Sequence, residues 1–478
     1  MKKIFRVLML MLTSLFMTAA LLRTQGNAFA ETISEIQEEA AAVSFAVSCD
    51  DVPEYRLGVI TDGNAYTYYQ FNADVKLTFK TSSPAKGLYF QFELPCRWTL
   101  SLPDGSVRQG GENEFVHEYF ALDSETTEFT VSLPAGAMLT DVYAFAEGEA
   151  PSWVQVWKPP CQRADLMLMP THADDEHLWF GGAMPYYAGE LGYEVQVVYL
   201  TNHYNDTRRM HELLNGLWTV GVRNYPIITD RFLDVVPTKW SVENAEAYFG
   251  REKVLAFQVE MLRRFAPRVI IAHDINGEYG HGAHILNATT LLEALRIYED
   301  PSVFPESAEK YGIQKVQKCY LHLWQENQIT VQWSDKTLDR FGGKNAFEMA
   351  VEGYNCHRSQ LRWKNYVLEW GNYDCRKFGL AYTTVGCDTP GLSDMFEHVD
   401  MSDKIAAQEQ EAEPPAENPT AVSPSDRTVS ASDENSDGDS YLHLHGIKIL
   451  KTDAMIAALA AGLALIGIIA VICVKRRR

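Results

Sequence analysis

The segment from Leu166 to Gly182 constrains the fold of this chain more than any other, because an apolar run there breaks into a cluster of histidines and carboxylates. Residues 164–169 are largely apolar and are typical of a buried strand, and a helical pattern resumes shortly afterwards. His172 and Asp175 lie between the two. Open parallel α/β sheets hold their ligands at such positions, beyond the carboxyl ends of the strands. The sequence therefore predicts an α/β fold with a site where this strand ends.

A second polar cluster, His273–His284, follows another apolar run, Val269–Ala272, which the pattern predicts to be a later strand of the same sheet. His281 and His284 have the spacing of one helical turn, and residues 285–298 are typical of a helix with a buried leucine face. Either cluster alone is explained equally well by solvated loop charges. Two such clusters after two strands favour a metal site, and their nitrogen and carboxylate ligands suit zinc or a similar first-row divalent ion.

Both clusters resemble motifs of the LmbE-like, or GlcNAc-phosphatidylinositol de-N-acetylase (PIG-L), family of zinc hydrolases. The first family motif reads His-Pro-Asp-Asp-Glu and the second ends in His-x-x-His; they stand here as His172–Glu176 and His281–His284. By order of elements the resemblance covers residues 163–399, including the weaker segments Arg209–Glu212 and His357–Gln360. It implies a catalytic domain built on a Rossmann-like, mostly parallel sheet.

The resemblance also implies roles for the residues at the matching positions. His172, Asp175 and His284 would bind the zinc ion and leave one position open for water, as catalytic zinc sites require. Asp174 would be the general base for that water. His281 would stabilise the oxyanion or protonate the leaving amine. Another divalent first-row metal is the alternative to zinc.

The sequence departs from the family pattern at two positions without losing a ligand or the base. Ala173 replaces the usual proline, which is expected to relax the turn. Ala283 replaces an acidic residue that often precedes the last histidine, and this change is expected to remove a partner that orients His281. Glu176 is expected to support the turn rather than to react.

Both ends of the chain differ from a folded domain. Residues 1–30 have the basic start, apolar stretch and Ala28-Phe29-Ala30 ending of a secretory signal peptide. Residues 454–474 form an uncharged apolar run long enough to cross a bilayer, with a buried core helix as the alternative, and the basic tail 475–478 follows. Basic residues stay on the cytoplasmic side. We therefore expect a single-pass protein of the cell membrane with extracytoplasmic N-terminal domains and a cytoplasmic tail.

The composition before this apolar run predicts a spacer. Residues 401–450 are predicted to be a disordered acidic stalk, because the segment is rich in Glu, Asp, Pro and Ser and poor in large apolar side chains. The net charge of -21 argues against a nucleic-acid partner. P-loop, GxGxxG and GxSxG motifs are absent, which argues against phosphoryl transfer, dinucleotide chemistry and serine hydrolysis. The oligomeric state is left open.

Residues 44–158 have the pattern of an all-β domain, most simply a sandwich. Alternating runs are separated by Pro, Gly, Asp and Ser. The expected strands are Val75–Phe79, Gly87–Phe92, Trp98–Leu102, Thr127–Leu133 and Asp141–Ala146.

Within this region Ile60–Asn64, followed by Thr67-Tyr68, resembles the opening of galactose-binding-like (discoidin, F5/8 type C) domains. Such domains often bind sugars through loop aromatics, and packing in the core is the alternative for each ring. The candidate rings are Tyr66, Tyr68, Tyr69, Trp98 and Trp153.

The eight cysteines include no CxxC pair, so one or two disulfides are compatible with an exported chain but their pairing is not specified. The hypothesis that joins these observations is a membrane-anchored, extracytoplasmic, zinc-dependent de-N-acetylase of an N-acetylglucosamine-like glycan or glycoconjugate. The acetylated sugar comes from the resemblance alone. The alternatives are an amidase on another N-acyl glycoside and a surface glycan-binding protein with a decayed catalytic domain.

Overall fold

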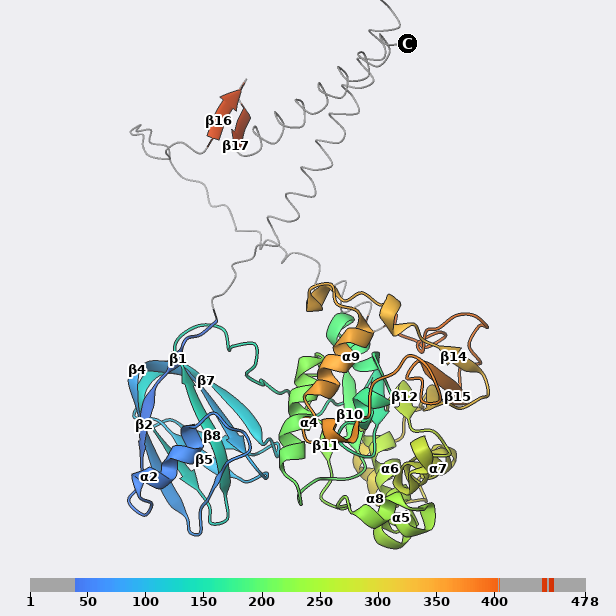
Figure 1. The fold of residues 1–478 in the computed structure, drawn as a ribbon, viewed down its shortest axis with the longest axis horizontal. Helices are drawn as coiled ribbons and strands as arrows, with labels where there is room; N and C mark the ends of the chain where they lie inside the picture. The colour runs from blue at the N-terminus through green and yellow to red at the C-terminus, as the bar shows by residue number, and fades with distance from the viewer. Residues whose placement is uncertain (1–38, 403, 405–440, 445–446, 451–478) are drawn as a thin grey trace, which may run out of the picture. The chain divides into compact units, whose positions relative to one another are not determined.

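The computed structural model describes residues 39–402, residue 404 and two short strands near the C-terminus (Figure 1). The predicted signal peptide (1–30), membrane span (454–474) and tail (475–478) lie outside the described residues. Among the residues that are described, no helix is long and apolar enough to cross a bilayer. The chain divides into two units, Met1–Met401 and Ser402–Arg478.

The second unit contains two described strands. Strands β16 (Tyr441–Leu444) and β17 (Ile447–Leu450) pair antiparallel inside the predicted stalk 401–450. Most other residues of that stalk lie outside the described part of the chain.

The N-terminal part of the first unit is built from strands, with two short helices, α2 (Glu54–Leu57) and η1 (Gly58–Thr61). Its strands form one eight-stranded sheet in the order β1-β8-β4-β7-β5-β6, with β2 paired to β4 and β3 to β8. Each predicted strand falls within an observed one, to within one residue. The strands are β1 (Ala42–Val43), β2 (Phe45–Ser48), β3 (Tyr69–Gln70), β4 (Val75–Phe92), β5 (Trp98–Ser101), β6 (Val107–Gly110), β7 (His117–Leu133) and β8 (Met138–Phe145).

The long strand β4 changes partners along its length. Its first half pairs with β2 and its second half with β8, while β7 runs beside both halves. The register against β7 shifts between Lys80 and Gly87, which is where a bulged strand bends. The all-β prediction is confirmed, whereas the division into two packed sheets stays a prediction.

The five aromatic candidates for sugar stacking differ in exposure. Trp98 is a core residue, since it is buried against Phe90 with ring centroids 4.5 Å apart. Tyr69 is half-buried and packs on Phe71. The rings that reach solvent are Tyr66, Tyr68 and Trp153.

The rest of the first unit, from about residue 164 to 401, is an α/β domain on a seven-stranded sheet of order β11-β10-β9-β12-β13-β15-β14. The first five strands of this order run parallel, and β15 is antiparallel to both of its neighbours. The predicted mostly parallel sheet is confirmed. The strands are β9 (Leu166–Met169), β10 (Val195–Tyr199), β11 (Ile227–Ile228), β12 (Val269–Ala272), β13 (Lys318–His322), β14 (Gln328–Thr330) and β15 (Lys377–Thr383).

Helices cover both faces of this sheet (Figure 1). Successive residues of β9 alternate between two hydrophobic cores: Leu166 and Leu168 pack with α4 and α9, and Met167 and Met169 with α5, α6 and α7. A strand buried on both faces needs the continuous apolar run seen in the sequence. The helices are α3 (Asp175–Leu178), η2 (Met184–Glu190), α4 (Arg208–Thr219), η3 (Val236–Lys239), α5 (Val242–Phe249), α6 (Arg251–Phe265), η4 (Glu278–Gly280), α7 (Gly282–Ile297), α8 (Pro305–Tyr311), η5 (Trp333–Asp335), η6 (Asp339–Phe341), α9 (Ala346–Asn355) and η7 (Leu361–Trp363).

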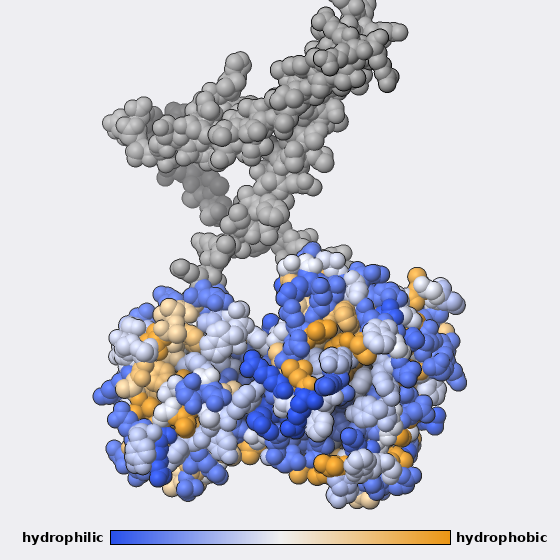
Figure 2. Space-filling model, in the orientation of Figure 1, coloured by the Kyte–Doolittle hydropathy of each residue, from blue (hydrophilic) through white to orange (hydrophobic). Residues whose placement is uncertain are grey.

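The surface on the face shown in Figure 2 is mainly hydrophilic, with smaller hydrophobic patches. Several aromatic rings are exposed on loops and short helices of the α/β domain. Trp240 follows η3, Trp363 belongs to η7 and Trp370 lies in the following loop, each more than 60% exposed. Flat apolar rings at the surface are suited to stacking on sugars.

The cysteines of the described residues are all unpaired. They comprise Cys49, Cys96, Cys161, Cys319, Cys356, Cys375 and Cys387. No disulfide therefore contributes to the part of the chain that the structure describes.

A buried polar chain joins the β-sheet part to the α/β domain. His117 Nε2 lies 2.7 Å from Nδ1 of His211 in α4, and His117 Nδ1 lies 2.7 Å from Oε1 of Gln155. Both imidazoles are fully buried. The hydroxyl of Tyr225 also accepts a hydrogen bond from the Val116 amide.

We expect His117→Ala to lower the free energy of unfolding by about 1–3 kcal/mol, because it leaves buried partners without a hydrogen bond. Urea denaturation followed by circular dichroism measures the change. The control is His398→Asn, since His398 is 47% exposed and asparagine tolerates its φ of 64°, so this change should alter stability by less than about 0.5 kcal/mol. Equal effects of the two variants would show that the buried chain does not stabilise the interface.

Candidate metal centre

The turn after β9 is held by its neighbours on both sides. The Thr171 amide donates to Nε2 of His273 at the end of β12, and the carbonyl of Thr171 accepts from the Thr201 hydroxyl beyond β10. Asn287 of α7 donates to the Thr171 hydroxyl. Since β9 pairs with β12 up to the register Met169–Ala272, the loops that follow the two strands begin side by side. The two sequence clusters therefore meet at one edge of the sheet, as predicted.

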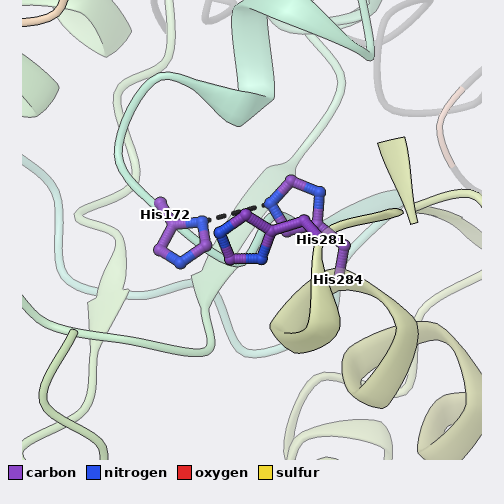
Figure 3. Close-up of side chains that lie close together, drawn as sticks. All are labelled: His172, His281 and His284. Carbon is purple, nitrogen blue, oxygen red and sulfur yellow. Dashed lines mark hydrogen bonds between the residues drawn. The ribbon is translucent and has the colours of Figure 1, made fainter. Parts of the chain in front are cut away.

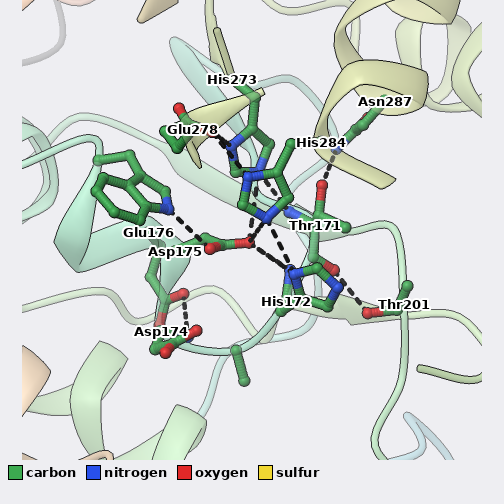
Figure 4. A network of polar contacts seen from close by, with 12 residues as sticks. Thr171, His172, Asp174, Asp175, Glu176, Thr201, His273, Glu278, His284 and Asn287 are labelled. Carbon is green, nitrogen blue, oxygen red and sulfur yellow. Dashed lines mark hydrogen bonds and ion pairs between the residues drawn. The ribbon is translucent and has the colours of Figure 1, made fainter. Parts of the chain in front are cut away.

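Three predicted ligands meet there through one atom each. Nδ1 of His172 lies 3.2 Å from Oδ2 of Asp175 and 3.1 Å from Nε2 of His284, and the last two atoms are 3.2 Å apart. All three side chains are buried. The structure thus brings His172, Asp175 and His284 to a common point (Figure 4).

The triangle fits a small divalent ion. Zinc binds nitrogen and carboxylate oxygen at about 2.0–2.2 Å, so tetrahedral ligand atoms lie roughly 3.4 Å apart. The three separations of 3.1–3.2 Å are close to this value. One carboxylate and two imidazoles form the donor set expected for zinc or another first-row metal.

Neighbouring side chains orient the ligand atoms. The Trp179 indole donates to Oδ1 of Asp175, which leaves Oδ2 facing the histidines. Nδ1 of His284 lies 2.8 Å from Oε2 of Glu278, so an N–H there leaves the Nε2 lone pair for a metal. Burial alone would raise the pKa of Asp175, but His284 and His273 outweigh burial and hold this pKa well below its usual range. Asp175 is therefore a carboxylate.

Glu278 is the centre of the surrounding polar network, and this role was not predicted although the residue lies within the cluster His273–His284. Its carboxylate lies 2.8 Å from Nδ1 of each of His273, His284 and His322. Figure 4 shows it beside His273 and His284. Burial would raise the pKa of Glu278, but the three histidines hold the pKa well below its usual range. These four residues are distant in sequence or lie on different elements. The end of β12, the end of β13, the η4 turn and the start of α7 bring them together.

Asp174 lies on the same turn, and its carboxylate is not one of the three triangle atoms. Its backbone has φ 117°, which a non-glycine residue rarely adopts, and its amide donates to Oε2 of Glu176 at 2.9 Å. This contact agrees with the predicted supporting role of Glu176. Burial raises the pKa of Asp174 to about 8, against the opposing charge of Arg209 at 3.3 Å. A carboxyl group with such a pKa can exchange protons near neutral pH.

His281 lies beside the triangle at the start of α7. Its ring centroid is 4.8 Å from that of His172 and 4.3 Å from that of His284, and the three imidazoles point toward one another (Figure 3). One nitrogen of each comes within 4.8 Å of the other two. Burial, together with His284 and His172, holds the pKa of His281 far below its usual range. His281 is thus a neutral imidazole, and its Nδ1 has no hydrogen-bond partner among the described residues.

The two departures from the family pattern have different consequences. The amide of Ala173 donates to Nε2 of His203 at 3.0 Å, a contact that proline could not make. The turn is therefore anchored rather than relaxed. Ala283 is buried, and the acid that orients a histidine comes from Glu278 instead, toward His284 and not His281.

A second set of residues around the turn was also not predicted as part of the site. Asp234 lies 3.6 Å from Nε2 of His172 and 3.4 Å from Nδ1 of His203. Arg209 contacts both Asp174 and Asp234. Only the segment Arg209–Glu212, which resembles the family weakly, pointed to this set of residues in the sequence. A lone residue such as His203 belongs to no motif whose spacing could indicate its role.

Metal affinity should rise with pH. Burial would lower the pKa of His284, but Asp175 and Glu278 raise it to about 9 in the metal-free protein. Below this pH a proton must leave before the nitrogen binds metal. We expect the zinc dissociation constant to fall about tenfold per pH unit between about pH 6.5 and 8.5, measured by competition with a chelator of known affinity. A pH-independent constant would show that His284 is not protonated in the metal-free site.

The structure thus defines a buried cluster of histidines and carboxylates at the carboxyl edge of a parallel sheet, and this cluster could hold a divalent metal ion. No family model matches the chain. Part of it is similar to 1D-myo-inositol 2-acetamido-2-deoxy-alpha-D-glucopyranoside deacetylase of Streptomyces scabiei, with 28% identity over 176 residues, or 32% of this chain and 54% of the relative. Deacetylase 2 of the same name from Saccharopolyspora erythraea is 30% identical over 172 residues, or 31% of this chain and 63% of the relative.

The match therefore spans less than two thirds of the length of these relatives. Among solved structures, N,N'-diacetylchitobiose deacetylase from Pyrococcus horikoshii covers 42% of this chain and 74% of its own, with 18% identity and a TM-score of 0.33. The names of the two sequence relatives agree with the predicted class of enzyme, a deacetylase.

Proposed function

We propose that this protein is a zinc-dependent de-N-acetylase of an N-acetylglucosamine-like glycan or glycoconjugate. The observation that carries the proposal is the triangle formed by His172 Nδ1, Asp175 Oδ2 and His284 Nε2, with Asp174 on the adjoining turn. A glycan-binding protein has no need of three converging metal ligands beside a carboxyl group with a raised pKa. The names of the relatives, which are deacetylases of an acetamido sugar, support the substrate class.

A divalent metal held by the triangle would supply a Lewis acid for the attacking water and the amide carbonyl. Asp174 accepts the proton of this water as the oxygen attacks the carbonyl carbon. The same carboxyl group then returns the proton to the nitrogen as the C–N bond breaks, which releases acetate and an amine. Its raised pKa, about 8, makes both steps accessible near neutral pH.

His281 acts on the oxygen that becomes negative. Because its imidazole is neutral, it donates an N–H hydrogen bond to the oxyanion. The second role implied by the family, protonation of the leaving amine, needs an imidazolium, which this environment disfavours. We therefore assign the proton to Asp174 and the oxyanion to His281.

The proposed location rests on the sequence. If residues 1–30 are a signal peptide and residues 454–474 a membrane span, as the sequence predicts, the catalytic domain lies outside the cell and its substrate is an extracytoplasmic glycan. The β-sheet part is proposed to be galactose-binding-like, and its exposed rings Tyr66, Tyr68 and Trp153 are available to a sugar. Proteolysis of intact cells tests the orientation, since the catalytic domain should be cleaved while a C-terminal epitope tag is protected.

The direct test is acetate release from N-acetylglucosamine oligomers by the purified full-length protein. We expect release after zinc loading and none after chelation or in the variant His172→Ala. The matched control is His398→Ala, which changes an exposed histidine and should release acetate at the normal rate. A zinc-loaded protein that releases no acetate from any N-acetyl sugar would contradict the proposal.

A further inference from the structure

A second buried cluster lies behind the turn that carries Asp174. It consists of Glu176 and His177 of α3 and His357, which follows α9, and all three side chains are completely buried. Oε1 of Glu176 lies 3.1 Å from Nε2 of His357 and 3.5 Å from Nε2 of His177. The cluster is separate from the ligand triangle, because the two carboxylates of Asp175 and Glu176 engage different histidines.

The polar atoms of this cluster are unusual for a protein interior. Oε1 of Glu176, both ring nitrogens of His177 and both of His357 have no hydrogen-bond partner among the described residues. Buried polar groups nearly always have one, and an exception calls for an unseen water or ion. An ion pair between Glu176 and a protonated His357 would engage two of these five atoms. It would leave both nitrogens of His177 without a partner.

Two glycines leave room for the imidazoles between α4 and α9. A Cβ atom at Gly216 would lie 2.8 Å from Nε2 of His177 and 3.1 Å from Nε2 of His357. A Cβ atom at Gly353 would lie 2.6 Å from Nδ1 of His177. Any larger residue at these positions would push the rings aside, so the glycines keep both histidines directed at the carboxylate.

The separations are compatible with a metal ion. The ligand atoms of Glu176, His177 and His357 all come within 4.8 Å of one another, and the two distances to Oε1 lie on either side of the roughly 3.4 Å expected for tetrahedral zinc ligands.

We propose that Glu176, His177 and His357 bind a second divalent metal ion, zinc or a similar first-row metal, in a closed structural site. The donor set is two imidazoles and one carboxylate, as in the first site. This ion ties α3 to the end of α9. Because Oε2 of Glu176 accepts the amide of Asp174, the same ion fixes the turn on which Asp174 lies.

The test is the zinc content of the full-length protein, measured by mass spectrometry after loading with zinc alone and removal of unbound metal. We expect two ions per chain in the wild type and in the control His398→Ala. His357→Leu and His177→Leu should each retain one ion, held by the first site. His172→Ala should also retain one, held by the second site, so failure of the two sites is distinguishable.

A wild-type chain that binds one ion or none would overturn the proposal, as would a second ion that persists in both leucine variants. If the leucine variants do not fold, anomalous scattering from wild-type crystals at the zinc edge decides. A peak between Glu176, His177 and His357 supports the proposal. A peak at His172 alone overturns it and assigns the second cluster to ordered water.

Discussion

Replacing Asp174 with asparagine should lower the rate of acetate release by about 10²- to 10⁴-fold, the usual contribution of a general base. The carboxyl group is the only part of the side chain that changes, and it lies outside the triangle of ligand atoms. Zinc content and the circular dichroism spectrum should therefore remain those of the wild type. The rate constant kcat on N-acetylglucosamine oligomers is the quantity to measure.

Asparagine is a better substitution here than alanine because of the backbone. Asp174 has φ 117°, and asparagine tolerates positive φ better than alanine does. Alanine would mix a backbone effect with the chemical one. Asp104→Asn, at an exposed turn of the β-sheet part, is the matched control and should leave kcat unchanged. A variant Asp174→Asn with normal kcat would remove Asp174 from the mechanism.

The sequence was sufficient to bring the candidate ligands together because of where they lie relative to the strands. His172 and Asp175 follow a buried strand by three to six residues, and His284 lies in the first turn of a helix that follows another strand. Parallel strands put such positions at one edge of the sheet, whatever the details of the loops. The local pattern therefore predicted both the strands and helices that carry these residues and the edge of the sheet at which the site lies.

The residues around the ligands could not be predicted in the same way. His322 is separated from Glu278 by 44 positions, and the contact exists only because β13 lies beside β12. His203 approaches the turn because its loop follows β10. Neither histidine has a motif, and a lone histidine in a sequence is more often an ordinary core residue. Strand order, which periodicity does not specify, decides these contacts.

The β-sheet part shows the same limit. Its strands were predicted because alternation is local, but the continuous pairing of β4 with β2, β7 and β8 depends on bulges that the alternation does not reveal. Trp98 illustrates the effect on function, since an aromatic residue that suits a sugar site proves to be in the core. Trp98 and Tyr66 are both aromatic, and only their exposure in the structure distinguishes a core ring from one that a sugar could reach.

The network around Glu278 leads to the second large effect. Glu278→Gln should weaken zinc binding about 10- to 100-fold, because the neutral amide no longer orients His284 as a carboxylate does. It should also lower the free energy of unfolding of the metal-free protein by about 3–5 kcal/mol, since the carboxylate lies 2.8 Å from three buried histidines and its loss leaves them without a compensating charge.

Two measurements separate these effects. Zinc competition with a chelator gives the affinity, and urea denaturation of the metal-free protein gives the stability. Glu326→Gln, an exposed residue of the loop after β13, should change neither. Destabilisation with normal zinc affinity would mean that Glu278 only maintains the fold and that His284 is positioned by α7 alone. Weaker zinc binding with normal stability would mean that the buried charges are already compensated elsewhere, and that the network exists for the metal.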